Sequence, residues 1–153
     1  MRIEFTVTGY PPKKHGEKSM FAQSYEAPRV ASLREKTLEA RKQAGFNEPF
    51  DCLVALELQI FVPKPQLESI GDLDSFIAGV CDSLQVVDPQ VLPYLDETLR
   101  GLNGGDHPRH ALLIANDAKV ASIMARKVAL GENQKVHYTV AIEPRSQDIV
   151  EEE

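Results

Sequence analysis

The sequence has no tryptophan, only two cysteines, and no apolar stretch that approaches the length of a membrane span. Cys52 and Cys81 lie inside hydrophobic stretches and show neither CxxC nor Cys/His spacing. This pattern predicts two buried thiols in a reducing compartment and argues against a disulfide scaffold or a zinc site. The first residues alternate in polarity and contain no signal-peptide core, so we expect a cytoplasmic protein with no membrane partner.

The chain also lacks the GxSxG, P-loop and Rossmann glycine patterns, so nothing in it supports a nucleophilic hydrolase, an NTPase or a dehydrogenase. Its formal net charge is −6. That balance argues against nucleic-acid binding by bulk electrostatics, because phosphate neutralisation needs clustered lysine and arginine. A locally basic groove, or phosphate contact through a metal ion, stays open.

The length of 153 residues and the apolar content of 42% fit one domain. Period-2 alternation predicts strands at residues 3–7, 54–62, 119–128 and 136–142, and helical spacing predicts helices at 28–44 and 73–84. The β-α-β-α-β-β order predicts an α+β domain over residues 1–146, with two main helices on one face of a mixed four-stranded sheet. An insertion at Val86–Ile114 precedes the last two strands, and residues 147–153 form an acidic tail that we expect to be frayed.

Asp72 and Asp74 stand at the start of the second helix, in a stretch from Lys64 to Arg100 with no lysine or arginine in between. Within a helix, residues two apart point about 200° away from each other. At a helix start, however, Asp72 is still extended and Asp74 begins the first turn, so both side chains can converge. Two ionised carboxylates near the amide dipoles suit Mg²⁺ or Mn²⁺. The alternative is ordinary helix capping, with Asp72 as the N-cap residue.

Two further carboxylates could belong to the same site. Asp117 comes just before the third predicted strand, and three carboxylates would surround one or two cations if that strand neighbours the helix start. The alternative for Asn116-Asp117 is a simple turn. Asp82 lies two turns along the helix and about 80° around from Asp74, so we expect it behind the metal ligands or in solvent.

The segments "GDLDSFIAGVCDSLQ" and "NDAKV" resemble the RusA family of Holliday-junction resolvases, whose members carry D-L-D-N-x-x-K-x-x-x-D-A-L and a later D-D-x-x-V. The stretches "TGYPPKKHGEK" and "SYEAPR" are also similar to elements of that family. The resemblance implies that Asp72, Asp74 and Asp117 bind Mg²⁺ in a site that cleaves phosphodiester bonds, and that Asp82 is the matching acidic residue of the helix. It further implies a homodimer that acts on branched DNA.

The family lysine falls on Ala78 here, and the family asparagine falls on Ser75. We hypothesise that Lys119 partly replaces that lysine as a catalytic cation, because two residues apart on a strand it would share a face with Asp117. The alternative is a solvent-facing edge lysine. The best candidates for DNA phosphate contacts are Lys13, Lys14, Lys18 and Arg29.

The sequence therefore predicts a Mg²⁺-dependent, structure-selective endonuclease that cleaves branched DNA such as Holliday junctions during recombination and repair. The resemblance implies products with a 5′-phosphate and a 3′-hydroxyl. The alternative is a nuclease-derived DNA-binding or assembly module, which Ala78 and the acidic balance favour.

Overall fold

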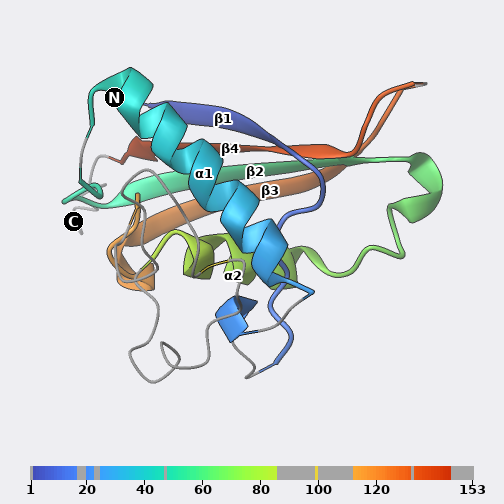
Figure 1. Cartoon of the computed structure of the whole chain (residues 1–153). Helices are drawn as coiled ribbons and strands as arrows, with labels where there is room; N and C mark the ends of the chain where they lie inside the picture. The colour runs from blue at the N-terminus through green and yellow to red at the C-terminus, as the bar shows by residue number, and fades with distance from the viewer. Residues whose placement is uncertain are drawn as a thin grey trace, which may run out of the picture.

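A computed structural model describes residues 2–16, 20–22, 25–46, 48–85, 99, 112–131 and 133–145. Lys18, most of the predicted insertion and the acidic tail lie outside these ranges. The described elements follow in the order β1 (Ile3–Thr8), η1 (Met20–Ala22), α1 (Ala27–Ala44), β2 (Val54–Val62), η2 (Lys64–Gln66), α2 (Leu73–Ser83), η4 (Asp117–Lys119), β3 (Val120–Ala129) and β4 (His137–Pro144) (Figure 1).

The four strands form one mixed sheet in the order β1-β4-β2-β3. β4 is antiparallel to both of its neighbours, whereas β3 is parallel to β2 and begins level with it, with Val54 opposite Val120. A parallel pair needs a long crossover connection, which here contains α2. The predicted α+β class, mixed sheet and two main helices are confirmed.

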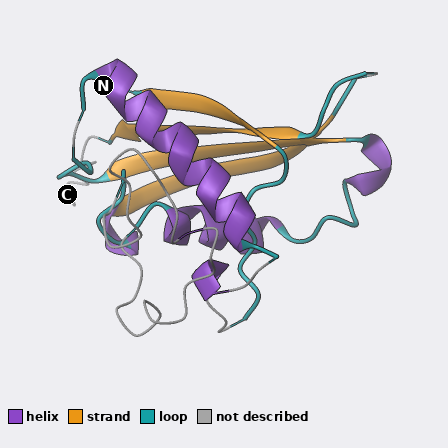
Figure 2. Ribbon diagram, in the orientation of Figure 1, coloured by secondary structure: helices purple, strands orange, loops and turns teal. Residues whose placement is uncertain are grey.

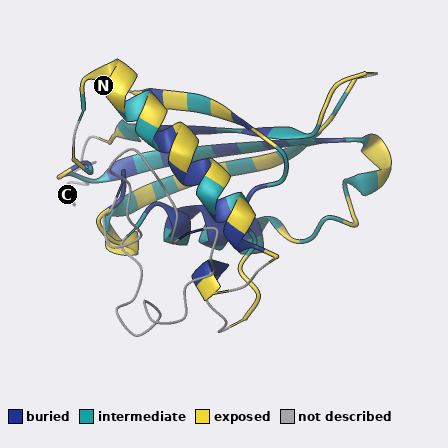
Figure 3. Ribbon diagram, viewed as in Figure 1, coloured by how far each residue is buried: buried dark blue, intermediate teal, exposed yellow. Residues whose placement is uncertain are grey.

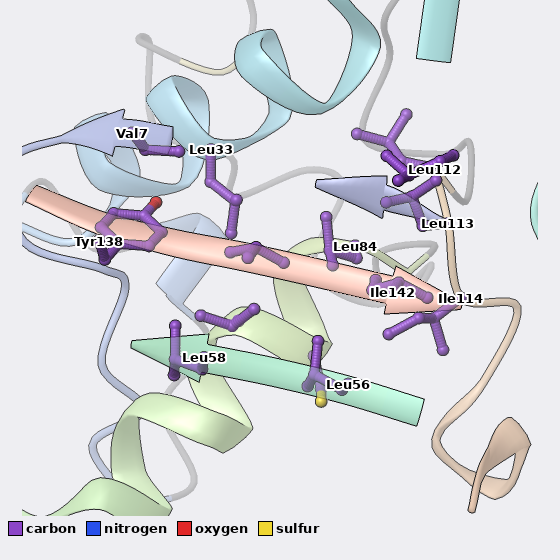
Figure 4. Packing of buried hydrophobic residues seen from close by; sticks show 14 of the residues in the cluster. Val7, Leu33, Leu56, Leu58, Leu84, Leu112, Leu113, Ile114, Tyr138 and Ile142 are labelled. Carbon is purple, nitrogen blue, oxygen red and sulfur yellow. The ribbon is translucent and has the colours of Figure 1, made fainter. Parts of the chain in front are cut away.

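Both helices pack on the same face of the sheet (Figures 1 and 2). β2 alternates between buried and half-buried residues along its whole length, which places Val54, Leu56, Leu58, Ile60 and Val62 in the core as predicted (Figure 3). The core joins side chains of α1, α2, β2 and β4, among them Leu33, Leu56, Leu58 and Tyr138 (Figure 4). Among the described residues, no helix is long and apolar enough to cross a membrane.

The first helix begins and ends as its sequence predicts. Pro28 lies in the first turn, and Gly45 ends the helix with a positive φ of 69° that favours glycine. The sequence pattern of this helix gave no sign that Arg34 is fully buried. Its guanidinium donates to the carbonyl oxygens of Ser83 (2.8 Å) and Gln85 (3.2 Å). These bonds satisfy carbonyl groups at the end of α2 and fasten α1 to it.

The segment after β1 runs across α2 at very short range. Gly79 faces the backbone of this segment, and a Cβ at that position would lie 2.6 Å from the Pro12 carbonyl carbon. The Lys14 amide also donates to the Ser75 carbonyl oxygen at 3.1 Å. The close approach requires glycine at position 79, and it places Lys13 and Lys14 on the surface of α2.

Candidate functional site

The start of α2 presents two open carboxylates. Asp72 has an extended backbone (φ −80°, ψ 144°) and Asp74 lies in the first helical turn, which is the predicted arrangement. Both residues are exposed, and the Asp72 side chain makes no capping hydrogen bond. Asp72 is thus the N-cap residue, as the capping alternative expected, but its side chain does not bond to the helix amides. Within the described part of the chain, neither carboxylate has a hydrogen-bond or ion-pair partner.

Lys13 lies directly beside this helix start. Its ammonium nitrogen is 3.4 Å from the Ile70 carbonyl oxygen, and its side chain lies over Gly71, where a Cβ would be 2.6 Å from the Lys13 Cε atom. Gly71 has a φ of 123°, so both its conformation and this contact favour glycine. The ammonium group also lies 5.9 Å from the centre of the Phe76 ring. A cation predicted only as a phosphate contact thus stands next to the carboxylate pair.

Asp117 lies elsewhere. It accepts a hydrogen bond from the Gln85 side chain, which also donates to the Cys81 carbonyl oxygen at 3.0 Å. Cys81 follows Asp74 by two helical turns, or about 10 Å along the axis. The topology explains this position, because β3 begins level with the start of β2 whereas α2 begins after the end of β2. The structure places Asp117 at the C-terminal end of α2 (Figure 1) and does not bring it to Asp72 and Asp74.

A second cluster of charged side chains lies at the C-terminal end of α2. Lys14 makes an ion pair of 2.9 Å with Asp82. The hydrogen bond and charge of Asp82 raise the pKa of Lys14, and the charge of Asp117 adds a smaller contribution in the same direction. Asp82 and Asp117 are thereby placed near one lysine, which holds the segment after β1 on α2. Asp82 was expected behind the metal ligands or in solvent, and the structure instead pairs it with Lys14.

The geometric reason for choosing Lys119 does not hold. Asp117 and Lys119 belong to the 3₁₀ turn η4, and β3 starts only at Val120, so the two residues do not alternate along a strand. The Asn116 side chain accepts a hydrogen bond from the Ala118 amide at 3.0 Å, which confirms the turn alternative for this segment. A catalytic role of Lys119 stays a prediction without that support.

The donor set can be tested for its fit to a divalent ion. Mg²⁺ is held in many proteins by one or two carboxylates, with water and phosphate oxygens in its remaining positions. Asp72 and Asp74 supply that number of carboxylates at the start of α2. Among the described residues, no three histidine, cysteine, aspartate or glutamate side chains form a group placed to hold a metal ion. The fit is thus to two protein ligands, and the third predicted ligand, Asp117, is not joined to them.

A pocket of about 300 Å³ opens beside the helix start. Its lining combines three aromatic rings, three basic side chains and one acid, from Tyr10, Lys13, His15, Tyr25, Glu26, Arg29, Ser69, Ile70 and Phe76. We refer to it as the Tyr25 pocket. Of these residues only Lys13 and Arg29 were candidates from the sequence. The others come from three distant segments, so no local pattern could identify them.

The two cysteines are free thiols, as predicted. Burial raises the pKa of Cys81 to about 12, and the charges of Asp117 and Asp82 act in the same direction. The thiol therefore stays protonated at neutral pH, which is the weakly nucleophilic form. Cys52 is only half-buried, so the prediction of two buried thiols is correct for Cys81 and wrong for Cys52.

Comparison with models of protein families gives no match to the chain. A comparison with curated proteins also gives no match.

Proposed function

We propose that the chain is a Mg²⁺-dependent endonuclease, with Mn²⁺ as a second possible ion, that cleaves phosphodiester bonds in branched DNA such as Holliday junctions. The observation that carries the proposal is the pair of exposed carboxylates at the start of α2, neither of them used in capping. A helix N-terminus favours their ionised form. Their place beside a cation is what metal-assisted phosphoryl chemistry needs, and the sequence resemblance to RusA-type resolvases points to the same reaction.

Each residue has a defined role in this proposal. Asp72 and Asp74 hold the ion, which when bound polarises the scissile phosphate and lowers the pKa of an attacking water. Lys13 supplies positive charge to that phosphate, the role that the family pattern gives to the position of Ala78. Arg29 binds a neighbouring phosphate.

The Lys14–Asp82 pair and Asp117 position the segment that carries Lys13. Asp117 as a third ligand, Lys119 as a catalytic cation and Lys18 as a DNA contact remain parts of the proposal. So do the homodimer, the cytoplasmic location and the role in recombination and repair.

The test is cleavage of a synthetic four-way junction with Mg²⁺ or Mn²⁺. We expect Asp72→Asn and Asp74→Asn to abolish turnover and to keep or improve DNA binding, because each change removes a negative charge near phosphate. Asp51→Asn removes an exposed carboxylate elsewhere and is the matched control. Full activity in Asp72→Asn would refute the metal site. Asp117→Asn reports whether the third carboxylate joins the ion once DNA is bound.

The second candidate is a nuclease-derived DNA-binding or assembly module. The alanine at position 78 and the separation of Asp117 from the other carboxylates favour it. The two candidates differ in metal binding. An ion that binds only the folded protein raises its melting temperature by mass action, and Asp74→Asn removes that effect. No shift at tens of millimolar Mg²⁺, together with no cleavage, would favour the module.

A further inference from the structure

The Tyr25 pocket contains a large aromatic ring that is held in place although it faces solvent. Tyr25 is 68% exposed. The Arg29 guanidinium lies 4.7 Å from the centre of its ring and donates a hydrogen bond of 3.0 Å to its hydroxyl oxygen. The same guanidinium lies 5.3 Å from the centre of the Tyr10 ring. An exposed aromatic ring fixed by arginine offers a free face on which a flat group can stack.

The charges around the pocket are organised by one buried acid. Glu26 is fully buried, and its carboxylate accepts a hydrogen bond from the Lys13 amide at 3.2 Å. It also contacts the His15 Nε2 atom at 2.9 Å and the Arg29 guanidinium at 3.5 Å. A buried carboxylate is costly unless it is paired, so these contacts fix each partner in position.

The pocket keeps a positive balance in a chain of net negative charge. Lys13 and Arg29 are permanent cations at neutral pH, and Glu26 compensates for only one of them. The Lys13 ammonium and the Arg29 guanidinium each retain donors that these contacts do not use. A phosphate group matches these donors in charge and in hydrogen-bonding type.

We propose that the Tyr25 pocket binds one unstacked nucleotide of a DNA strand. Its base stacks on Tyr25, Arg29 holds one of its two flanking phosphates, and Lys13 contacts the other. The volume of about 300 Å³ is at the small end of ligand sites, which suits one nucleotide and excludes a duplex.

This inference deepens the proposed function and rests on it for the assignment of the ligand as DNA. The pocket adjoins the proposed site, because its lining includes Lys13 and Ile70, which lie beside the start of α2. A nucleotide in the pocket places the adjoining phosphate beside Asp72 and Asp74. A base at a branch point or an end costs less to unstack than a base within a duplex, so a pocket for an unstacked base favours branched DNA.

The experiment measures binding in EDTA, so that it is independent of cleavage. A fluorescein-labelled ten-residue oligothymidylate is the probe, with fluorescence anisotropy as the readout, and thymidine monophosphate and an unlabelled duplex of the same length are competitors. We expect the single strand to bind more tightly than the duplex. We expect Tyr25→Ala to weaken it about 5- to 100-fold, because stacking of one base on an aromatic ring is worth that much. Tyr25→Phe, which keeps the ring, should bind within about twofold of wild type.

Met124→Ala changes another large exposed side chain, 58% exposed and on β3, and is the matched control. Unchanged affinity in Tyr25→Ala at an unchanged melting temperature would overturn the inference, as would equal binding of duplex and single strand. Thymidine monophosphate that binds as tightly as the oligonucleotide would identify a free nucleotide as the ligand and overturn the DNA assignment. Binding that depends on Tyr25 in a protein that cleaves nothing would refute the nuclease and leave the pocket intact. Junction cleavage that is unaffected by Tyr25→Ala would refute the role of the pocket and leave the nuclease proposal intact.

Discussion

Gly79→Ala tests whether the contact between α2 and the segment after β1 builds the site. In an ordinary helix this change stabilises by about 1 kcal/mol, because glycine is the poorer helix former. Here the new Cβ would lie 2.6 Å from the Pro12 carbonyl carbon and 3.0 Å from the Lys13 amide nitrogen. These are backbone atoms that no rotamer change can move, so the segment must lift. Overpacking of this kind costs about 1–3 kcal/mol.

Lifting the segment also breaks the hydrogen bond from the Lys14 amide to the Ser75 carbonyl oxygen, which contributes about 1 kcal/mol. The Lys14–Asp82 ion pair is on the surface and adds less than that. After the helix-propensity gain is subtracted, the net loss is about 1–3 kcal/mol. For a chain of 153 residues this lowers the melting temperature by about 2–12 °C.

Thermal unfolding followed by circular dichroism measures this shift, and oligonucleotide binding in EDTA at 20 °C measures the effect on the Tyr25 pocket. The matched control is Ala78→Gly at the adjacent helical position, which loses about 1 kcal/mol through propensity alone and leaves the segment in place. We expect both variants to melt lower, and only Gly79→Ala to lose binding. A melting temperature that rises in Gly79→Ala would refute the reasoning, because it would mean that helix propensity outweighs the contact.

Three further predictions concern single side chains. Lys13→Ala should lower the initial rate of junction cleavage about 100-fold, the typical effect of removing one charge-stabilising group, and Lys119→Ala should lower it much less. A larger loss in Lys119→Ala than in Lys13→Ala would assign the catalytic role to Lys119 instead. Arg34→Leu should lower the unfolding free energy by about 3 kcal/mol in urea, because it leaves buried carbonyl oxygens at the end of α2 without a donor, whereas exposed Arg126→Leu should change it little. Between pH 9 and about pH 12 stability should fall as pH rises, because the Cys81 thiol ionises near 9.0 in the unfolded chain and only near 12 in the fold; Cys81→Ala should flatten that part of the melting profile.

The strands and helices could be predicted because each is encoded by a local period. β2 follows strict alternation from Val54 to Val62, and α2 follows helical spacing from Leu73, so the element bounds differ from expectation by only a residue or two. Arg34 could not be predicted as a core residue, because its burial depends on carbonyl groups that α2 presents from 49 residues further along the chain. A charged residue on a helix with few apolar residues gives no local sign of such a partner.

The candidate site shows the same division between local and distant information. The backbone at Asp72 and Asp74 depends on four or five consecutive residues, and its extended N-cap followed by a first helical turn is as expected. The position of Asp117 depends instead on whether β3 pairs parallel or antiparallel to β2. In a parallel crossover the helix must run back along the strands. The start of the helix and the start of the next strand therefore lie at opposite ends of the strands. No spacing within the sequence distinguishes the two possibilities.

Under the proposed function, the same topology changes which part of the molecule would supply the positive charge. Because the crossover takes Asp117 to the far end of α2, charge at the helix start must come from a segment that reaches it independently. That segment follows β1, and Gly79 allows its backbone to lie on the helix with Lys13 beside Gly71. The family pattern places its cation on the helix itself, whereas this chain has alanine there and a lysine arriving from outside. A site built in this way depends on a backbone contact rather than on a motif, so one methyl group at position 79 should disturb it as much as the loss of a ligand.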